Sequence, residues 1–268
     1  MTSRPLDDVL VRRGDAETIT RQDRREVVVL AERPDITITW SRYAPGERGP
    51  DPHVHRGHTD AFYVLAGELT FLVGPDDERI RAPAGGFVAV PPNVVHSFVN
   101  EGSLDACWLN LHAPDTGFGA YLRALRDGTD AVFDSFDPPA DGGLPARKAI
   151  VTGPGDGERL MYGNRVVLLK GALPDVCVTE WVLDGRFEGP HLHQHDRQVD
   201  SFYVLEGELD LTIEGSVHTA GPDTLALVPR GVRHTFAHSG AGRARVVNVH
   251  APDGGFADFL RRSADQWH

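Results

Sequence analysis

The sequence has few of the residues that would point to several common classes of protein. Its two cysteines, Cys107 and Cys177, each lie inside an apolar, strand-like run. A thiol in such a run behaves as a small hydrophobic side chain, and two cysteines are too few for a disulfide scaffold, so we expect a reducing, cytoplasmic location. The only lysines are Lys148 and Lys170, which we expect at the surface or at strand edges. Schiff-base chemistry therefore has few candidate residues.

Positive charge and long apolar runs are also scarce. The chain has 27 Lys and Arg against 39 Asp and Glu, a formal net charge of -12, and no long run of basic residues. This balance argues against binding to nucleic acid or to an anionic membrane surface, and it favours a small-molecule partner. No stretch approaches about 18 apolar residues, and the first residues contain no apolar signal-peptide core. We therefore expect neither a membrane span nor an export signal.

The chain repeats itself. The segment FYVLAGEL at 62–69 recurs as FYVLEGEL at 202–209, and HAPDTGFGAYLR at 112–123 recurs as HAPDGGFADFLR at 250–261. With 268 residues, the chain is long enough for two compact domains, each with its own core. Between the copies lies a segment dense in Asp, Gly and Pro, which we interpret as a linker. The predicted division is therefore 1–127, a linker at 128–147, and 148–268.

Each half has the pattern of an all-β domain. Its apolar runs are short and rich in Val, Ile, Thr and aromatic residues, and turn residues separate them at intervals of about 8–12 residues, as in antiparallel sandwiches and barrels. One short helix is expected at the end of each half. The first has an apolar face within 118–125 and Gly128 at its C-cap, and its copy covers 256–260.

A group of histidines and an acid in the first half has the spacing of a metal site. His53 and His55 are two residues apart, so on a strand their side chains point to the same face. Asp60 begins the next strand, and His96 follows a Pro-Pro-Asn turn on a third. Three neutral imidazoles and a carboxylate that converge in this way suit a divalent transition metal, with a position left open for water, O2 or substrate.

The second half repeats this group as His193, His195, Asp200 and His234. A lone His-x-His pair is more often a polar strand edge or a hydrogen-bonded core feature than a pair of ligands. Two copies of a four-residue pattern are much harder to explain by chance. We therefore predict up to two metal ions per chain.

These motifs resemble the paired signature motifs of the cupin superfamily. The flanking segments GPDPHVH, FYVLAGEL, VPPNVVHSF and APDTGF are similar to those of small bacterial bicupins related to quercetin 2,3-dioxygenase. The resemblance implies two tandem double-stranded β-helix barrels, or jelly rolls, each with a metal site. It does not specify a reaction, because the same barrel serves dioxygenases, isomerases, decarboxylases, polyketide cyclases and storage proteins.

The sequence departs from the family pattern at the acid. Such enzymes usually carry Glu as the fourth ligand, whereas Asp60 and Asp200 are one methylene shorter. The shorter acids fit either of two roles, that of a metal ligand or that of a hydrogen-bonding base beside the metal. The segment from Gly85 to Asn100, which contains His96, is closer to the family pattern than its counterpart in the second half, where Asp223 replaces the leading glycine. We therefore expect the first half to carry the chemistry.

Several neighbouring residues have more than one interpretation. His58 is either an extra ligand or, as we favour, a solvated turn histidine. His191 precedes His193 and His195 at the same spacing and is either an outlier, because it lies outside the register shared with the first half, or part of a shifted ligand set. His112 and His250 either contact substrate or form buried hydrogen bonds before the helix. Strand alternation directs Phe62 and Phe98, otherwise core residues, toward the same cavity as Asp60 and His96, which predicts an aromatic-lined pocket.

The leading hypothesis is a metal-dependent, dioxygenase-like enzyme that acts on a hydroxylated aromatic or enolisable small molecule. The metal would be Fe, Mn, Co, Ni or Cu, O2 would be the co-substrate, and Asp60 would accept the substrate's proton. One alternative is a polyketide cyclase or isomerase that uses the ion, then Zn, as a Lewis acid. The other is a non-catalytic binding protein with a closed metal site. A monomer or a homodimer fits each hypothesis.

Overall fold

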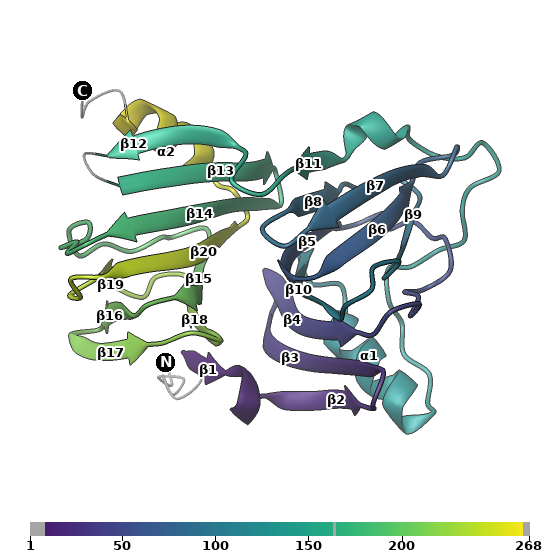
Figure 1. Cartoon of the computed structure of the whole chain (residues 1–268), viewed down its shortest axis with the longest axis horizontal. Helices are drawn as coiled ribbons and strands as arrows, with labels where there is room; N and C mark the ends of the chain where they lie inside the picture. Colours follow the sequence, from purple (N-terminus) through teal and green to yellow (C-terminus); the bar gives the residue numbers. More distant parts are fainter. Residues whose placement is uncertain (1–8, 163–164, 265–268) are drawn as a thin grey trace. The chain divides into compact units, whose positions relative to one another are not determined.

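The computed structural model describes residues 9–162 and 165–264 and divides the chain into two compact units. The first module is Ala16–Asp156, and the second module joins the start of the chain, up to Asp15, to the residues from Gly157 onward. Each module is built from antiparallel strands with one α-helix near its end (Figure 1). The predicted all-β fold with two tandem copies is therefore confirmed.

The first module contains a seven-stranded and a three-stranded sheet. The larger sheet has the order β11-β8-β5-β10-β4-β3-β2, and the smaller has the order β7-β6-β9. The elements are β2 (Glu17–Arg21), β3 (Arg25–Arg33), β4 (Ile36–Tyr43), β5 (Thr59–Ala66), β6 (Glu68–Val73), β7 (Glu78–Pro83), β8 (Phe87–Val90), β9 (His96–Val99), β10 (Ala106–Ala113), α1 (Phe118–Asp127), a 3-10 turn (Ala146–Lys148) and β11 (Ile150–Thr152).

The second module repeats this topology. Its larger sheet has the order β1-β18-β15-β20-β14-β13-β12, and its smaller sheet has the order β17-β16-β19. The elements are β1 (Leu10–Arg12), a 3-10 turn (Arg13–Asp15), β12 (Glu158–Tyr162), β13 (Arg165–Leu173), β14 (Val176–Asp184), β15 (Val199–Glu206), β16 (Leu209–Ile213), β17 (Ser216–Ala220), β18 (Thr224–Val228), β19 (His234–Ala237), β20 (Arg243–Ala251) and α2 (Phe256–Ala264). Within the described residues, strand pairing does not join the two sheets of either module into a closed barrel.

The repeated FYVL-x-GEL motif forms the tight connection between the two sheets of each module. Gly67, between β5 and β6, has a positive φ of 66°, and a Cβ atom there would lie 2.3 Å from the Asp105 carbonyl oxygen. Gly207 occupies the same position in the second module, with φ of 73° and the Arg243 carbonyl oxygen at 2.4 Å. Only glycine fits this conformation and this close approach. The motif therefore repeats because the turn requires it.

The module boundaries differ from the predicted ones because each module includes a strand that we had placed elsewhere. β1 pairs with β18, so residues 9–15 extend the second module's sheet instead of the first's. β11 pairs with β8, so residues up to 156 belong to the first module. Both are three-residue strands that cover a sheet edge. Such short strands carry too little periodicity to be assigned to a partner from sequence.

A cluster of aromatic side chains lies within the mostly aliphatic core of the first module. Phe62, Phe71 and Phe98 pack with ring centroids 4.8–6.1 Å apart, and Trp108 meets Phe98 edge to face at 5.4 Å. In the second module, Phe202 and Phe236 form the corresponding contact at 5.0 Å. These contacts account for the aromatic residues of the repeated motifs.

Lys170 departs from its expected surface or strand-edge position. It lies in β13, which is flanked by β12 and β14, and it is only 1% exposed. The alternation of an internal strand thus directs this side chain into the protein.

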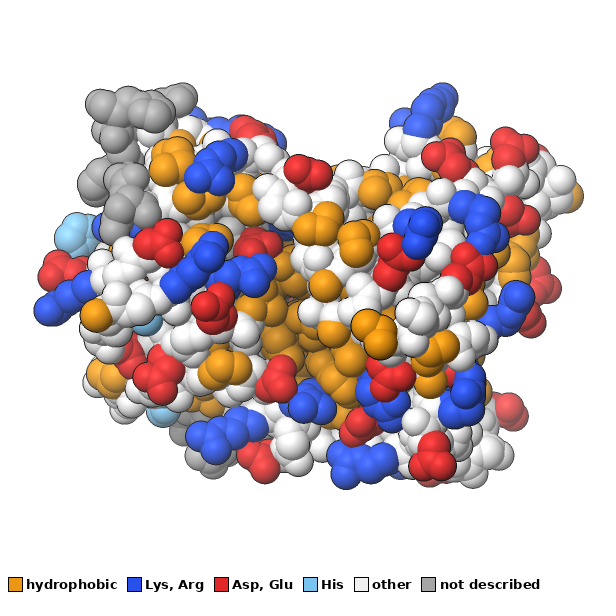
Figure 2. Space-filling view, viewed as in Figure 1, with side chains coloured by type: hydrophobic (Ala, Val, Ile, Leu, Met, Phe, Trp, Pro, Cys, Tyr) orange, Lys and Arg blue, Asp and Glu red, His pale blue; other side chains and the backbone are white. Residues whose placement is uncertain are grey.

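The two helices end the repeats as predicted. Gly128 follows α1 with φ of 67°, and its N–H donates to the Ala124 carbonyl oxygen, which is a glycine C-cap. None of the described helices is long and apolar enough to cross a membrane. On the face shown in Figure 2, basic side chains are interspersed with acidic ones. The predicted absence of a nucleic-acid partner stays a prediction.

Candidate metal centre

The first module brings His53, His55, Asp60 and His96 together. His53 lies in an extended segment that pairs with the start of β9, because the backbones of His53 and His96 exchange hydrogen bonds of 3.1 and 2.9 Å. Asp60 is the second residue of β5. One ligand atom from each of the four side chains lies within 4.8 Å of the others, and all four residues are buried. The sequence spacing therefore predicted the convergence of these residues.

Backbone carbonyls orient all three imidazoles in the same way. The Nδ1 atoms of His53, His96 and His55 lie 2.9, 3.1 and 2.5 Å from the carbonyl oxygens of Asp51, Val94 and Asp134. A carbonyl oxygen can only accept, so each Nδ1 carries the proton and each Nε2 presents its lone pair to the centre. The buried Nε2 of His55 has no hydrogen-bond partner among the described residues.

The resulting donor set fits a cation. The Asp60 Oδ2 atom lies 3.3 Å from the Nε2 atom of His96 and 3.6 Å from that of His55. Burial, together with the neighbouring His96 and His55, lowers the pKa of His53 to about 3, so its imidazole is neutral near pH 7. Lone pairs and a carboxylate that face one another in a buried space need a positive charge between them. Three imidazoles and an acid are a donor set for a divalent transition metal.

Asp60 is held from its other side by the end of β10. Its Oδ1 atom accepts a 2.5 Å hydrogen bond from Asn110 Nδ2 and lies 3.6 Å from His112 Nε2. Burial alone would raise the pKa of Asp60, but the neighbouring imidazoles of His112, His55 and His96 lower it well below the usual range. The carboxylate is therefore ionised at neutral pH.

His58 is buried, contrary to the expectation of a solvated turn histidine. Its side chain is fully buried, and its ring nitrogens lie 2.8 Å from Asp134 Oδ2 and 2.9 Å from His112 Nδ1. Burial, followed by the charge of His55, lowers the pKa of His58 to about 4 despite the Asp134 carboxylate. His58 is not among the four residues of the donor set, but one ring nitrogen from each of His55, His58 and His112 lies within 4.8 Å of the others, so the extra-ligand role stays open.

His112 forms the buried hydrogen bonds that were one of its two expected roles, and its contact with substrate stays a prediction. It is buried, it stacks on Phe118 with ring centroids 3.7 Å apart, and its Nε2 lies 3.1 Å from Asn110 Oδ1. It also lines the cavity beside the donor set. His250 in the second module stacks on Phe256 in the same way, at 3.5 Å, but neither of its ring nitrogens has a hydrogen-bond partner among the described residues, so the buried hydrogen bonds expected for His250 are absent.

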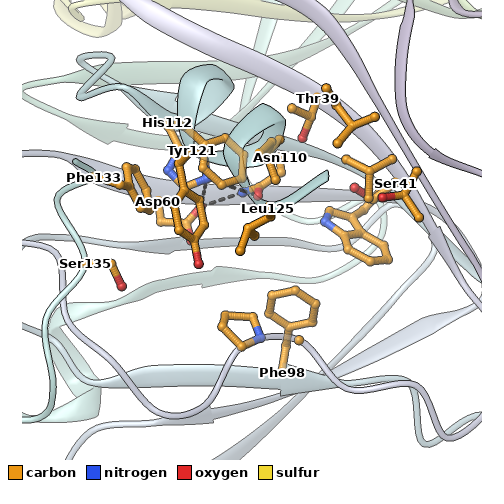
Figure 3. Close-up of a pocket in the computed structure, with 18 of the residues that line it drawn as sticks. Thr39, Ser41, Asp60, Phe98, Asn110, His112, Tyr121, Leu125, Phe133 and Ser135 are labelled. Atoms are coloured by element: carbon orange, nitrogen blue, oxygen red, sulfur yellow. Dashed lines mark hydrogen bonds and ion pairs between the residues drawn. The ribbon is translucent and has the colours of Figure 1, made fainter. Parts of the chain in front are cut away.

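The donor set opens onto a cavity of about 270 Å³ inside the first module. Figure 3 shows Asp60, Asn110 and His112 grouped near the rings of Tyr121 and Phe133, with Phe98 across the cavity. Thr39 and Ser41 of β4 contribute hydroxyl groups to another part of the wall. The remaining lining residues are Ile19, Thr20, Arg25, Val27, Tyr43, Gly49, Pro50, His53, His55, Trp108, Phe118, Leu122, Leu125 and Ser135.

Phe62 does not line this cavity, whereas Phe98 does. Phe62 is fully buried in the core, where its ring meets that of Phe98 edge to face at 5.4 Å. The alternation of strand residues correctly predicted that Phe62 and Phe98 point to the same side of the sheet. Phe62 packs against Phe98, and only Phe98 reaches the cavity. Phe62 therefore supports the wall and does not form it.

The segment that we had interpreted as a linker forms part of the site. Phe133 and Ser135 line the cavity, and the Phe133 ring packs against Tyr121 and Phe118 with centroids 5.0 and 5.2 Å apart. The Asp134 backbone and side chain contact His55 and His58. The only sequence signal for this role was two phenylalanines in an otherwise polar segment.

The second module forms a similar but more exposed donor set from His193, His195, Asp200 and His234. Carbonyl oxygens accept from His193 Nδ1 at 2.8 Å and His234 Nδ1 at 2.9 Å, and Asp200 Oδ2 lies 3.1 Å from His234 Nε2. The side chain of His195 is 21% exposed, compared with 2% for His55. His191 is exposed and contributes only its backbone carbonyl, to His193.

An indole stands in the second module at the position of a cavity-lining serine in the first. Trp181 stands at the repeat position of Ser41. Its Nε1 donates a 3.1 Å hydrogen bond to Thr179, the counterpart of the cavity-lining Thr39, and its ring stacks on Tyr162 at 6.1 Å. The second module thus places a large ring, packed against core residues, where the first module has the small Ser41 side chain at the cavity wall.

Comparison with known proteins identifies the family. The model of the cupin domain matches residues 39–112 and 180–250, one match in each half of the chain. The chain belongs to the cupin family. Both donor sets lie within these two matches.

Individual relatives of this cupin differ in function. Quercetin 2,3-dioxygenase of Bacillus subtilis is 31% identical over 88 residues, a match that spans 32% of this chain and only 25% of that protein. The crystal structure of AerE from Microcystis aeruginosa is similar with a TM-score of 0.64 and 15% identity, covering 91% of this chain and 99% of AerE. Oxalate decarboxylase of Bacillus subtilis has a TM-score of 0.60 and 13% identity, covering 91% and 76% of the two chains. At these identities, the two structures show the shared fold alone.

Proposed function

We propose that the first module is the active centre of a metal-dependent, dioxygenase-like enzyme that acts on a hydroxylated aromatic or enolisable small molecule. The observation that carries this proposal is the aromatic-lined cavity of about 270 Å³ that opens directly onto His53, His55 and Asp60. The similarity to quercetin 2,3-dioxygenase supports the same class of chemistry.

His53, His55 and His96 would hold the ion through their Nε2 atoms. When bound, a divalent transition metal supplies Lewis acidity that favours the ionised form of a substrate hydroxyl, and it leaves positions open for substrate and O2. The protein fixes the ligand geometry beforehand, because each Nδ1 is tied to a backbone carbonyl. Little reorganisation is then needed on binding.

The cavity walls would bind and orient a flat substrate. Phe98 and Trp108 come from the core of the module, and Tyr121 and Phe133 from the helix and the segment after it. Their rings bury apolar area and favour stacked or edge-to-face contacts with an aromatic ligand. Thr39 and Ser41 offer hydroxyl groups to the polar substituents of such a ligand.

Asp60 would accept the proton of the substrate hydroxyl. It is ionised and lies within the donor set, and Asn110 Nδ2 holds its second oxygen. A carboxylate with a lowered pKa is a weak base, so this transfer requires a hydroxyl that has itself become more acidic. That requirement favours phenols and enols over simple alcohols, because their conjugate bases are delocalised.

The proposal is tested by oxygen consumption. Metal-free protein is reconstituted separately with Fe, Mn, Co, Ni, Cu or Zn, and O2 uptake is measured with flavonols and other hydroxylated aromatics. We expect uptake with at least one redox-active metal and not with Zn, and entry of both atoms of 18O2 into the product. Conversion of the same compounds with Zn and without O2 uptake would instead support the cyclase or isomerase. Binding of these compounds without turnover under any metal would support the non-catalytic alternative.

The second module is a candidate for a structural copy or a second centre. Trp181 places a large ring where the first module has the cavity-lining Ser41, which favours the structural copy. A selective loss of turnover from first-site variants would support this assignment.

A further inference from the structure

Asp134 is attached to the first metal centre by both its backbone and its side chain. Its carbonyl oxygen lies 2.5 Å from His55 Nδ1. Its carboxylate accepts hydrogen bonds from the backbone N–H groups of Gly57 at 2.6 Å and Arg56 at 3.1 Å, and it lies 2.8 Å from His58 Nδ1. One residue of the irregular segment after α1, inside the first module, thus contacts a candidate ligand and the turn that follows it.

These contacts determine how His55 meets an ion. The carbonyl oxygen can only accept, so it fixes the His55 proton on Nδ1 and leaves the Nε2 lone pair directed at the centre. The carboxylate fixes the position of that carbonyl, because it ties Asp134 to the backbone of residues 56–57. The side chain of Asp134 therefore acts on the ligand through its own backbone.

The second module provides an internal comparison. His193 and His234 donate to carbonyl oxygens as their counterparts do, but no described residue forms the corresponding contact with His195 Nδ1. The His195 side chain is 21% exposed, and that of His55 is 2% exposed. Two otherwise similar donor sets thus differ in whether one imidazole is fixed in place.

We propose that Asp134 is a positioning residue of the first metal centre, and that its hold on His55 makes the first site retain a divalent transition metal more tightly than the second. The inference rests on the metal-binding part of the proposed function and is independent of the reaction. Changes to residues that orient a metal-ligating histidine typically weaken metal affinity about 10- to 100-fold. We expect an effect of that size at the first site.

The experiment titrates metal-free protein with Co2+ against a competing chelator and follows the Co2+ d–d absorption. Two backgrounds separate the sites: His193→Ala/His234→Ala leaves only the first site, and His53→Ala/His96→Ala leaves only the second. Asp134→Asn and Asp134→Ala are introduced into each background. Asp137→Asn is the matched control, because Asp137 is an exposed carboxylate in the same segment.

In the first-site background, we expect Asp134→Asn and Asp134→Ala to weaken Co2+ binding by about 10- to 100-fold and to alter the d–d spectrum as His55 is released. Neither variant should change binding in the second-site background, and Asp137→Asn should change neither site. The unsubstituted first site should bind more tightly than the second. Thermal unfolding checks the fold of each variant, and if Asp134→Ala fails to fold, the nearly isosteric Asp134→Asn decides.

Two results would overturn the inference while the metal centre stands. One is first-site affinity within twofold of the parent in the Asp134 variants. The other is an equal loss at both sites, which would indicate general destabilisation. Absence of Co2+ binding at either site of the parent protein would refute the metal centre itself, and the inference with it.

Discussion

Replacement of Asn110 by Leu tests how the protein holds the buried carboxylate beside the metal. Asn110 Nδ2 donates to Asp60 Oδ1 at 2.5 Å and to the Ala61 carbonyl oxygen at 3.2 Å, and its Oδ1 lies 3.1 Å from His112 Nε2. Leucine is similar in size, so the change removes hydrogen bonds without opening a large cavity. A lost bond to a charged group costs about 1.5–3 kcal/mol, and an unsatisfied buried partner about 1–3 kcal/mol.

Because these contributions overlap within one network, we expect a total loss of about 2–4 kcal/mol. The measurement is urea unfolding of metal-free protein. Asn248→Leu is the matched variant, because Asn248 Nδ2 makes the same bonds to Asp200 at 2.6 Å and to Ser201 at 3.1 Å. Both variants should lose similar stability, but only Asn110→Leu should reduce turnover, by at least about tenfold through the misplaced base. A stability loss below about 1 kcal/mol for Asn110→Leu, or a selective loss of turnover in Asn248→Leu, would contradict this reasoning.

Three further predictions concern the same module. Ser41→Trp, which copies the second module, should abolish substrate binding by calorimetry while metal content is unchanged; unaltered binding would show that the cavity is not the substrate site. Asp60→Asn should retain metal but lower turnover by about 100- to 10,000-fold, whereas loss of the ion would make Asp60 a ligand. In metal-free protein, the pKa values of His53, His58 and His250 lie at about 3, 4 and 4. The unfolded chain takes up protons on these groups first as the pH falls below about 6.5, so the free energy of unfolding should fall by about 1 kcal/mol per histidine between pH 6.5 and 5.5. A urea midpoint that stays constant over this range would refute the buried neutral histidines.

The features that repeat in the sequence were predictable. The repeated motif predicted both the all-β module and its duplication. It recurs because the turn at Gly67 and the turn at Gly207 both require glycine, with a positive φ and a carbonyl oxygen close by. The two-residue spacing of His53 and His55 follows from strand geometry, and it correctly placed both side chains beside Asp60. Local periodicity and local turns thus accounted for the donor set.

The features that depend on long-range contacts were not predictable. His58 is buried against Asp134, which lies 76 residues further along the chain, so its local sequence did not indicate this partner. Phe133 joins the cavity wall from a segment with no period of its own, and β1 and β11 pair with strands that sequence patterns do not identify. In each case, the contact joins residues that are far apart in the sequence and belong to no common helix or strand pattern. A single sequence therefore does not indicate that they lie close together.

We propose that two histidine donor sets hold divalent metal ions and that the first carries the chemistry. The decisive measurement is elemental analysis of protein purified without added metal or affinity nickel and then reconstituted with Fe, Mn, Co, Ni, Cu or Zn, together with turnover of the same samples. We expect up to two ions per chain, the loss of one ion together with all turnover in His53→Ala, and the loss of one ion with measurable turnover kept in His193→Ala. No bound metal after reconstitution, or the reverse ranking of the two variants, would contradict this proposal.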